Sequence, residues 1–436
     1  MLQTVKNAWK LPELRNKILF TIFILIVFRF GSVLSVPFVD SSVLKEAFAQ
    51  QTAGTILDYF NMLSGEAFSR ATLFALSISP YITAQIVIQL LTIAIPALER
   101  MAKEGDEGRK KLSQITRYVT VALALLTAYG YYTYIKNTAG MAIQHDGVNR
   151  HFAAAVIIAC YCAGAAIIMW LAEKINEKGI GNGISIILLA NIVSRVPNNI
   201  IVAGRNLFTD FKFTTLIVDL LLIVIAVATV LFVVHMSDAE RRVPVQYAKR
   251  QVGRRMYGGQ STYLPLKLNM TGVMPIIFAS SIVTLPSTIG LMVGKDSTSG
   301  GFWGGFLKLF SYTSPLYSIL FFVLIIAFAY FYISISFNPI EVANNLKKNG
   351  GSILGIRPGK PTSDYIARIL SRITLIGAIF LGIIAVLPIV LTMIDQSFGS
   401  LAFAGSSIII VVGVIVETQT EIETQMSMRH YKGFLE

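Results

Sequence analysis

The chain has 436 residues, of which 54% are hydrophobic and 14% are charged, and its formal net charge is +13. Apolar runs of about 20 residues, each long enough to cross a hydrocarbon core, recur along it and exclude an ordinary soluble enzyme domain. Since no soluble domain is present to bind DNA, the positive charge indicates contact with anionic lipids and with partners at the membrane surface.

Ten apolar stretches predict ten transmembrane helices. They are 17–36, 71–94, 116–136, 152–172, 184–201, 215–235, 270–293, 314–337, 368–391 and 402–421. An even number of spans places both termini on one side. Most of the 37 Lys and Arg residues lie in the N-terminal segment, the even-numbered turns and the tail. We therefore expect both termini to be cytoplasmic. No small-residue cleavage site follows Val36, which indicates a retained first span.

The predicted spans divide into five and five. We expect an N-terminal half over 1–201, an external connection over 202–214, a C-terminal half over 215–421 and a cytoplasmic tail over 422–436. Five spans per half leave the halves in opposite orientations around a central pathway. The predicted fold class is an all-α polytopic membrane protein with two inverted halves around a pore.

The second predicted span is unusual for a helix that only faces lipid. Pro80 interrupts it, and three polar residues share its apolar helix: Thr83, Gln85 and Gln89. Polar side chains at membrane depth indicate a helix that lines a path through the bilayer. The preceding segment 61–70 is too polar to cross lipid alone and predicts a short re-entrant helix at the outer end.

Two predicted cytoplasmic connections, 236–268 and 338–367, are longer than the topology needs. Long loops in a compact protein are usually functional, although positive-inside charge alone is the simpler alternative. The run 243–247 alternates like a strand and 257–259 has the composition of a turn, which predicts a hairpin-like projection with arginines at its tip. We interpret this basic projection as a docking surface.

Several site types are not expected. Cys160 and Cys162 lie two apart on one predicted helix, where their side chains point to different faces, so we expect neither a disulfide nor a metal site. We find no phosphate-binding loop and no nucleophile elbow, and we expect no enzyme activity and no cofactor.

A secondary transporter for a small solute is the main alternative, because ten spans in inverted halves also fit that class. Transporters usually place ionisable groups at mid-membrane. Here Arg29 lies within the first span, and Asp219 and Glu417 lie near span ends, so no central binding site is indicated.

Six groups of motifs, in order along the chain, carry a resemblance to a known family. They are Phe60-Asn61-Met62 with Ser69-Arg70-Ala71 and Pro80-Tyr81-Ile82; Glu107-Gly108-Arg109-Lys110-Lys111 with Thr116-Arg117-Tyr118; Glu177-Lys178-Gly179-Ile180-Gly181-Asn182-Gly183-Ile184-Ser185; Tyr247-Ala248-Lys249-Arg250-Gln251 with Gly253-Arg254-Arg255; Leu264-Pro265-Leu266-Lys267 with Asn269-Met270; and Asn344-Asn345-Leu346-Lys347-Lys348 with Gly355-Ile356-Arg357-Pro358-Gly359. Over essentially its whole length the chain resembles the SecY-type protein-conducting channel of the bacterial Sec translocon.

The resemblance implies a pore that narrows at a ring of aliphatic side chains. The matching residues are Ile78, Ile82, Ile184, Leu188, Ile277 and Ile410. Such a ring excludes ordered water and ions at rest, and it offers no hydrogen bonds that would trap a passing polypeptide.

The resemblance also assigns the predicted re-entrant segment as the plug of the outer funnel. Its residues are Asn61, Met62, Leu63, Ser64, Gly65, Glu66, Ala67, Phe68, Ser69 and Arg70. The family often has a small residue where this chain has Glu66.

A lateral gate is implied between spans 2 and 3 of one half and spans 7 and 8 of the other. Thr83 and Leu285 match facing positions, and Gln89 with Asn182 could form hydrogen bonds that hold the gate closed. Pro80, Pro275 and Pro286 would interrupt or bend the helices at the gate.

The basic loops acquire partners by the same resemblance. Arg254, Arg255 and Arg357 match positions that engage the motor ATPase SecA or the ribosome. The small membrane subunits SecE and SecG, preproteins with signal sequences and anionic lipids are the other implied partners. The implied function is to pass unfolded preproteins across the bacterial plasma membrane and to release transmembrane segments laterally into the bilayer.

Overall fold

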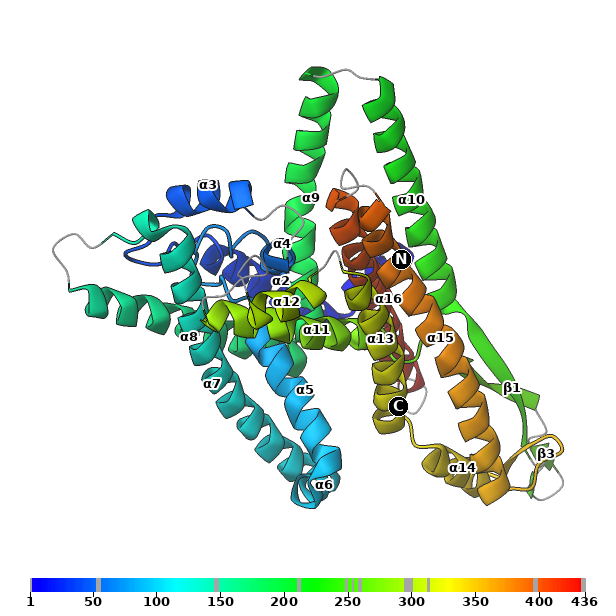
Figure 1. Cartoon of the computed structure of the whole chain (residues 1–436). Helices are drawn as coiled ribbons and strands as arrows, with labels where there is room; N and C mark the ends of the chain where they lie inside the picture. The colour runs from blue at the N-terminus through cyan, green and yellow to red at the C-terminus, as the bar shows by residue number, and fades with distance from the viewer. Residues whose placement is uncertain are drawn as a thin grey trace.

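The computed structural model shows a mainly helical chain with two small sheets among the described residues (Figure 1). It describes residues 2–51, 56–144, 149–209, 213–247, 250–252, 255–257, 261–293, 301–311, 314–394 and 399–432.

Nine α-helices and one 3-10 turn are described in the first half of the chain. They are α1 (Leu2–Trp9), α2 (Pro12–Gly31), α3 (Ser41–Gln51), α4 (Ile56–Leu63), α5 (Ser79–Ala94), α6 (Pro96–Lys103), α7 (Asp106–Thr138), η1 (Gly140–Ala142), α8 (Arg150–Lys178) and α9 (Gly183–Thr209).

The described part of the second half combines helices with five short strands. They are α10 (Phe213–Asp238), β1 (Glu240–Tyr247), β2 (Arg250–Val252), β3 (Arg255–Tyr257), β4 (Ser261–Lys267), α11 (Met274–Val293), α12 (Phe302–Leu309), α13 (Pro315–Ser336), α14 (Pro339–Lys348), β5 (Gly351–Ile353), α15 (Lys360–Ile394) and α16 (Gly399–Lys432).

Each of the ten apolar stretches overlaps one of these helices. By length and composition, three described helices could cross a membrane: Arg150–Lys178, Pro315–Lys348 and Lys360–Val390. A fourth candidate is α5 with α6, which together are bent by 102°. The connection expected over 202–214 is helical as far as Thr209 and again from Phe213. The helix of the expected tail continues to Lys432.

Two helix boundaries correct the sequence-based expectations. Pro80 and Pro275 lie in the first turns of α5 and α11, so they open these helices instead of interrupting them. Proline suits that position because the first turn does not use its missing N–H. Pro286 does lie inside α11, as expected.

The predicted plug helix over 61–70 is also shorter than expected. Helix α4 ends at Leu63, and residues 64–78 form consecutive turns. Gly65 (φ +64°) and Glu66 (φ +70°) adopt left-handed backbone conformations that cannot continue a right-handed helix.

The two long connections form one small module. Strand β1 pairs antiparallel with β4 and, on its other edge, with β5, in the order β4-β1-β5. The alternation predicted for 243–247 is confirmed, because Val243 and Val245 are buried and Pro244 is exposed. Strands β2 and β3 pair as a hairpin beyond β1 and β4. Of the turn expected at 257–259, Tyr257 ends β3, and residues 258 and 259 lie outside the described residues.

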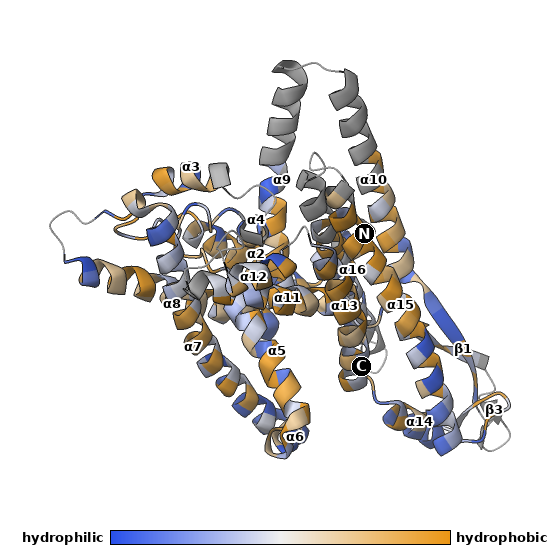
Figure 2. Cartoon of the chain, in the orientation of Figure 1, coloured by the Kyte–Doolittle hydropathy of each residue, from blue (hydrophilic) through white to orange (hydrophobic). Residues whose placement is uncertain are grey.

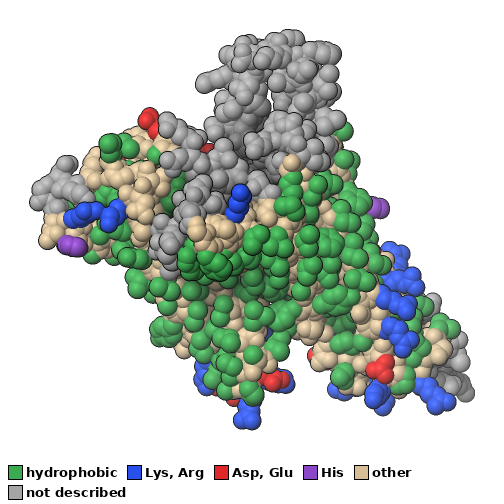
Figure 3. Space-filling view, viewed as in Figure 1, with side chains coloured by type: hydrophobic (Ala, Val, Ile, Leu, Met, Phe, Trp, Pro, Cys, Tyr) green, Lys and Arg blue, Asp and Glu red, His purple; other side chains and the backbone are tan. Residues whose placement is uncertain are grey.

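The helices share one large buried core that runs from α2 to α16. Apolar residues dominate the middle of the molecule, and hydrophilic residues gather at the end formed by α6, α14 and β1 (Figure 2). Lys and Arg side chains collect at that same end, whereas α9 and α10 project from the opposite end (Figures 1 and 3). The chain therefore has a polar, basic end next to an apolar body.

Candidate functional site: a buried aliphatic cluster, a cavity and a polar turn

The six aliphatic residues expected in the pore ring lie in one buried cluster. They come from four helices and their flanks, and none is more than 4% exposed: Ile78, Ile82, Ile184, Leu188, Ile277 and Ile410. Ile78 precedes α5 directly, and its spacing of four from Ile82 places both on one face, as for Ile184 and Leu188 on α9. The tertiary structure thus gathers positions that are more than 300 residues apart in the chain.

A cavity of about 1070 Å³, open solvent included, adjoins this cluster. Its walls come from α5, α7, α9, α11 and α16 and from the turn before α5. Four of the six aliphatic residues line it: Ile82, Leu188, Ile277 and Ile410. Thr83 of α5 and Leu285 of α11, the expected gate positions, line the same cavity.

Hydroxyl side chains of α11 also line the cavity, but their hydrogen bonds go to the helix itself. Ser281 donates to the carbonyl of Ile277 at 2.8 Å, and Thr288 donates to that of Thr284 at 3.0 Å. Hydroxyls satisfied in this way have little capacity left to hold a ligand. The wall is therefore weakly polar and carries no charged side chain among the residues that line it.

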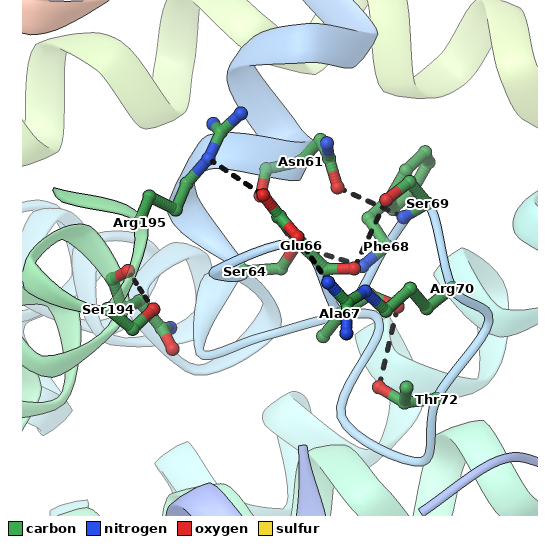
Figure 4. A network of polar contacts seen from close by, with 11 residues as sticks. Asn61, Ser64, Glu66, Ala67, Phe68, Ser69, Arg70, Thr72, Ser194 and Arg195 are labelled. Atoms are coloured by element: carbon green, nitrogen blue, oxygen red, sulfur yellow. Dashed lines mark hydrogen bonds and ion pairs between the residues drawn. The ribbon is translucent and has the colours of Figure 1, made fainter. Parts of the chain in front are cut away.

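The turn after α4 is a compact polar network (Figure 4). Asn61 Oδ1 accepts from the amide of Ser69 at 3.0 Å. Ser64 Oγ donates to the Asn61 carbonyl and accepts from the amide of Phe68, both at 3.0 Å. Asn61, Ser64 and Ser69 are all less than 9% exposed. These bonds satisfy the buried polar groups of a segment that could not face lipid.

The same segment contacts the pore cluster. Met62 and Leu63 belong to that cluster, and Ser407 Oγ of α16 lies 3.0 Å from Met62 Sδ. The Leu63 carbonyl accepts from Asn191 Nδ2 of α9 at 2.8 Å and from Ser77 Oγ at 3.1 Å. The segment therefore sits against the aliphatic residues and not on the outer surface.

Charges collect around Glu66. Arg70 pairs with it at 2.6 Å and Arg195 of α9 lies 3.9 Å from it (Figure 4). Arg29 of α2 approaches the neighbouring Gly65, and its Nη1 is buried without a partner among the described residues. A Cβ at Gly65 would lie 3.0 Å from Asn191 Oδ1, so close approach and backbone conformation both require glycine there.

Gln89 and Asn182, the residues expected to hold the gate closed, are not hydrogen-bonded to each other among the described contacts. Asn182 Oδ1 accepts from the amides of Ile184 at 3.0 Å and Ser185 at 3.5 Å, which caps α9. Gln89 Oε1 is buried and has no partner among the described residues. A hydrogen bond between Gln89 and Asn182 in the closed gate stays a prediction.

The expected docking arginines belong to the small module. Arg254 lies outside the described residues, and Arg255 is described as backbone in β3. Arg357 is exposed between β5 and α15. Nearby on β1, Arg242 donates a hydrogen bond to the Glu240 carboxylate, which raises the pKa of Arg242, and its guanidinium lies 4.7 Å above the ring of Tyr263. The module therefore presents a charged guanidinium group at Arg242.

Three residues at this site were not expected from the sequence: Ser77, Asn191 and Arg195. Asn191 and Arg195 are polar residues in or near an otherwise apolar run, and such residues tend to be functional. That signal could have identified them. Nothing in the sequence pairs either residue with the segment 61–70, which is more than 120 positions away.

Comparisons with known proteins give consistent results. A family model described as SecY matches residues 72–419. The chain is 42% identical, over the full length of both proteins, to the protein translocase subunit SecY of Streptomyces coelicolor, and 41% identical to that of Mycobacterium bovis.

The fold resembles solved channel structures. One, described as a protein conducting channel, superposes with a TM-score of 0.69 at 17% identity, covering 94% of this chain and 92% of the other. Another, of a SecY protein whose plug domain stabilises the closed channel, gives a TM-score of 0.67 at 18% identity with the same coverage.

Proposed function

The chain belongs to the SecY family, and on that premise we propose that it is the central subunit of a protein-conducting channel in the bacterial plasma membrane. It passes unfolded preproteins across the bilayer and releases transmembrane segments laterally into the lipid. One observation supports this most directly: residues from both halves of the chain converge on a buried aliphatic cluster beside a weakly polar cavity.

The aliphatic cluster supplies the seal in this proposal. Its six side chains carry no hydrogen-bonding groups, so a narrow passage between them excludes ordered water and ions. Because branched side chains can repack, the same passage widens around a polypeptide without binding it. The transporter alternative has no support from the relatives, which are protein translocase subunits.

The segment 61–70 is the plug. Its polar groups are satisfied by its own turn and by Asn191, while Met62 and Leu63 cover the aliphatic cluster.

The lateral gate lies where α5 and α7 meet α11. Thr83 and Leu285 line one cavity there, and an apolar signal segment entering it would compete with contacts between the helices. Binding of that segment to the open state shifts the equilibrium towards opening.

The proposed topology has ten spans in two inverted halves. Both termini and the basic module lie on the cytoplasmic side in this topology. Arg254, Arg255 and Arg357 would contact the motor ATPase SecA or the ribosome, and SecE and SecG would cover other helix faces. Two structural neighbours of this fold are channels in ribosome complexes, one of them canine Sec61. The motor would hydrolyse ATP, and the chain itself would provide the passage for the preprotein.

The test is single-channel conductance of the chain, reconstituted with its small subunits, before and after deletion of residues 61–70. We expect a tight resting bilayer that becomes leaky after the deletion, because the aliphatic cluster loses the segment that covers it. No conductance in either form would contradict the channel proposal. Substitution of Ala for Lys45, an exposed residue of α3, serves as the control and should leave the bilayer tight.

A further inference from the structure

An aromatic pocket beside the plug segment encloses Phe68, whose side chain is 5% exposed. The ring centroid of Phe68 lies 4.4 Å from that of Tyr131 and 5.6 Å from that of Phe48. The rings of Phe60 and Tyr134 lie 6.2 Å away. These distances are typical of favourable aromatic pairs. The pocket belongs to a second buried cluster, distinct from the one that contains the pore residues.

Tyr131 of α7 holds the backbone of Phe68 as well as its ring. Its hydroxyl donates a hydrogen bond to the Phe68 carbonyl oxygen, and both groups are buried. Tyr131 is itself fixed by an edge-on contact with Tyr161 of α8, whose ring centroid lies 5.0 Å away. The Phe68 carbonyl also accepts from the amide of Ala71 at 3.3 Å, so the Tyr131 hydroxyl is one of its two donors, and the loss of that buried bond weakens the hold on the segment.

Internal hydrogen bonds make the plug segment one compact body. The bond from the Ser69 amide to Asn61 and the bond from the Phe68 amide to Ser64 join its beginning to its end. Beyond it the chain is fixed, since Thr72 pairs with Ser35 in an isolated bridge. A movement that lifts Met62 off the pore cluster while keeping these bonds must therefore carry Phe68 out of its pocket.

We infer that Phe68 is the positioning residue that holds the plug shut, with Tyr131 as its receptor on the wall. The inference rests on the proposed role of 61–70 as the plug. Opening then breaks the contacts of Phe68 together with those of Leu63: the Phe68 ring leaves the pocket, its carbonyl gives up the Tyr131 hydroxyl, and the Leu63 carbonyl gives up Asn191 and Ser77. Phe68 and Tyr131 line the same cavity as four of the aliphatic residues, but their ring contacts belong to the second buried cluster. The plug is therefore held from the α7 and α8 side, and the seal itself need not bind it tightly.

The experiment measures how often the plug leaves. Ala67 is 2% exposed, and its methyl group makes no hydrogen bond, so Ala67→Cys places a thiol that is hidden while the plug is seated. Both native cysteines, Cys160 and Cys162, are first replaced by serine. The complex is reconstituted in bilayers, and a membrane-impermeant maleimide is added from the plug side. The labelling rate then reports plug release, whether or not ions pass.

Tyr131→Phe removes only the hydroxyl that binds the plug. We expect up to about tenfold faster labelling, because one buried hydrogen bond between the plug and α7 is lost. Phe68→Ala removes the ring and therefore all of its contacts in the aromatic pocket. This variant should accelerate labelling about a hundredfold or more. Tyr131→Phe should also transport preproteins with weakened signal sequences, since less binding energy is then needed to open the channel.

Tyr161→Phe is the matched control. The Tyr161 hydroxyl is buried in the same cluster but has no hydrogen-bond partner among the described residues. Its removal should leave the labelling rate unchanged. A general loosening of the cluster would accelerate both tyrosine variants equally, and that result would overturn the inference, as would wild-type rates in both Tyr131→Phe and Phe68→Ala.

The labelling experiment and the conductance experiment can fail independently of each other. If deletion of 61–70 causes no leak but Tyr131→Phe still accelerates labelling, the plug is not the seal while Phe68 still positions it. If the deletion causes a leak and the labelling rates do not change, Phe68 is not the positioning residue and the channel proposal stands.

Discussion

At the residue scale, the residues that would seal the pore differ from the residues that bind the segment 61–70. The six side chains of the pore cluster are aliphatic and buried, so they exclude water but make no directional bonds. The directional bonds lie just outside, where Asn191 and Ser77 meet the Leu63 carbonyl and where arginines surround Glu66. A channel that carries many different polypeptides needs this separation, because a polar ring would retain some of them.

A double substitution tests the seal. Ile82→Gly with Ile277→Gly should give a resting channel that conducts ions, because each change removes a buried side chain and costs the closed packing roughly 2–5 kcal/mol. The measurement is conductance without a preprotein. Ile93→Gly with Ile289→Gly is the matched control, since these isoleucines lie on the same two helices and are 56% and 48% exposed. If the ion conductance of the resting Ile82→Gly, Ile277→Gly channel equals that of the unsubstituted channel, these two isoleucines are not part of the seal.

At the scale of elements, the two long basic connections act as one unit. The three-residue strand β5 comes from the second connection and adds to β1 of the first, with Val245 opposite Ile353. Apolar side chains from both connections and from the start of α15 fill one small core. A partner that binds this module therefore contacts both connections at once, and Arg357 is exposed at its edge.

Charge reversal at that edge tests docking. Arg357→Glu should abolish motor-driven transport in reconstituted vesicles while the protein still inserts into the membrane, because the change replaces a guanidinium group with a carboxylate at a surface that binds acidic groups. Lys103→Glu makes the same charge change on the exposed helix α6 and should have much less effect. Normal transport by Arg357→Glu would exclude this arginine from the docking surface.

At the scale of the whole molecule, the cavity lies between groups of helices that are far apart in the chain. Helices α5 and α7 form one wall and α11 the other, and the two walls are in contact. Lateral release of a transmembrane segment requires these walls to separate, so a covalent link across them should stop it.

A reversible crosslink tests this separation. Cysteines at Thr83 and Leu285, in a chain without its native cysteines, are joined by oxidation to a disulfide. We expect transport and membrane insertion to stop after crosslinking and to return when the disulfide is reduced. The two single-cysteine variants, treated in the same way, are the controls. Undiminished transport by the crosslinked channel would place the gate elsewhere.

The sequence by itself determined the membrane class, the apolar stretches and the family. These depend on local properties: the length of an apolar run, the alternation that marks β1, and short motifs in a fixed order. The start of α5 and the end of α4 were placed less well, because a proline can open a helix as well as break it and left-handed residues at 65 and 66 are not visible in an apolar pattern.

Only the tertiary structure decided which residues meet. The bond from Asn191 to Leu63, the pairing of β5 with β1 and the seating of Phe68 against Tyr131 each join positions more than 60 residues apart. Such contacts follow from how helices pack, and a sequence read along its length carries no direct record of packing. For that reason the sequence predicted a plug and a seal, while the contact between Phe68 and Tyr131, which we propose holds the plug, follows only from the packing of the helices.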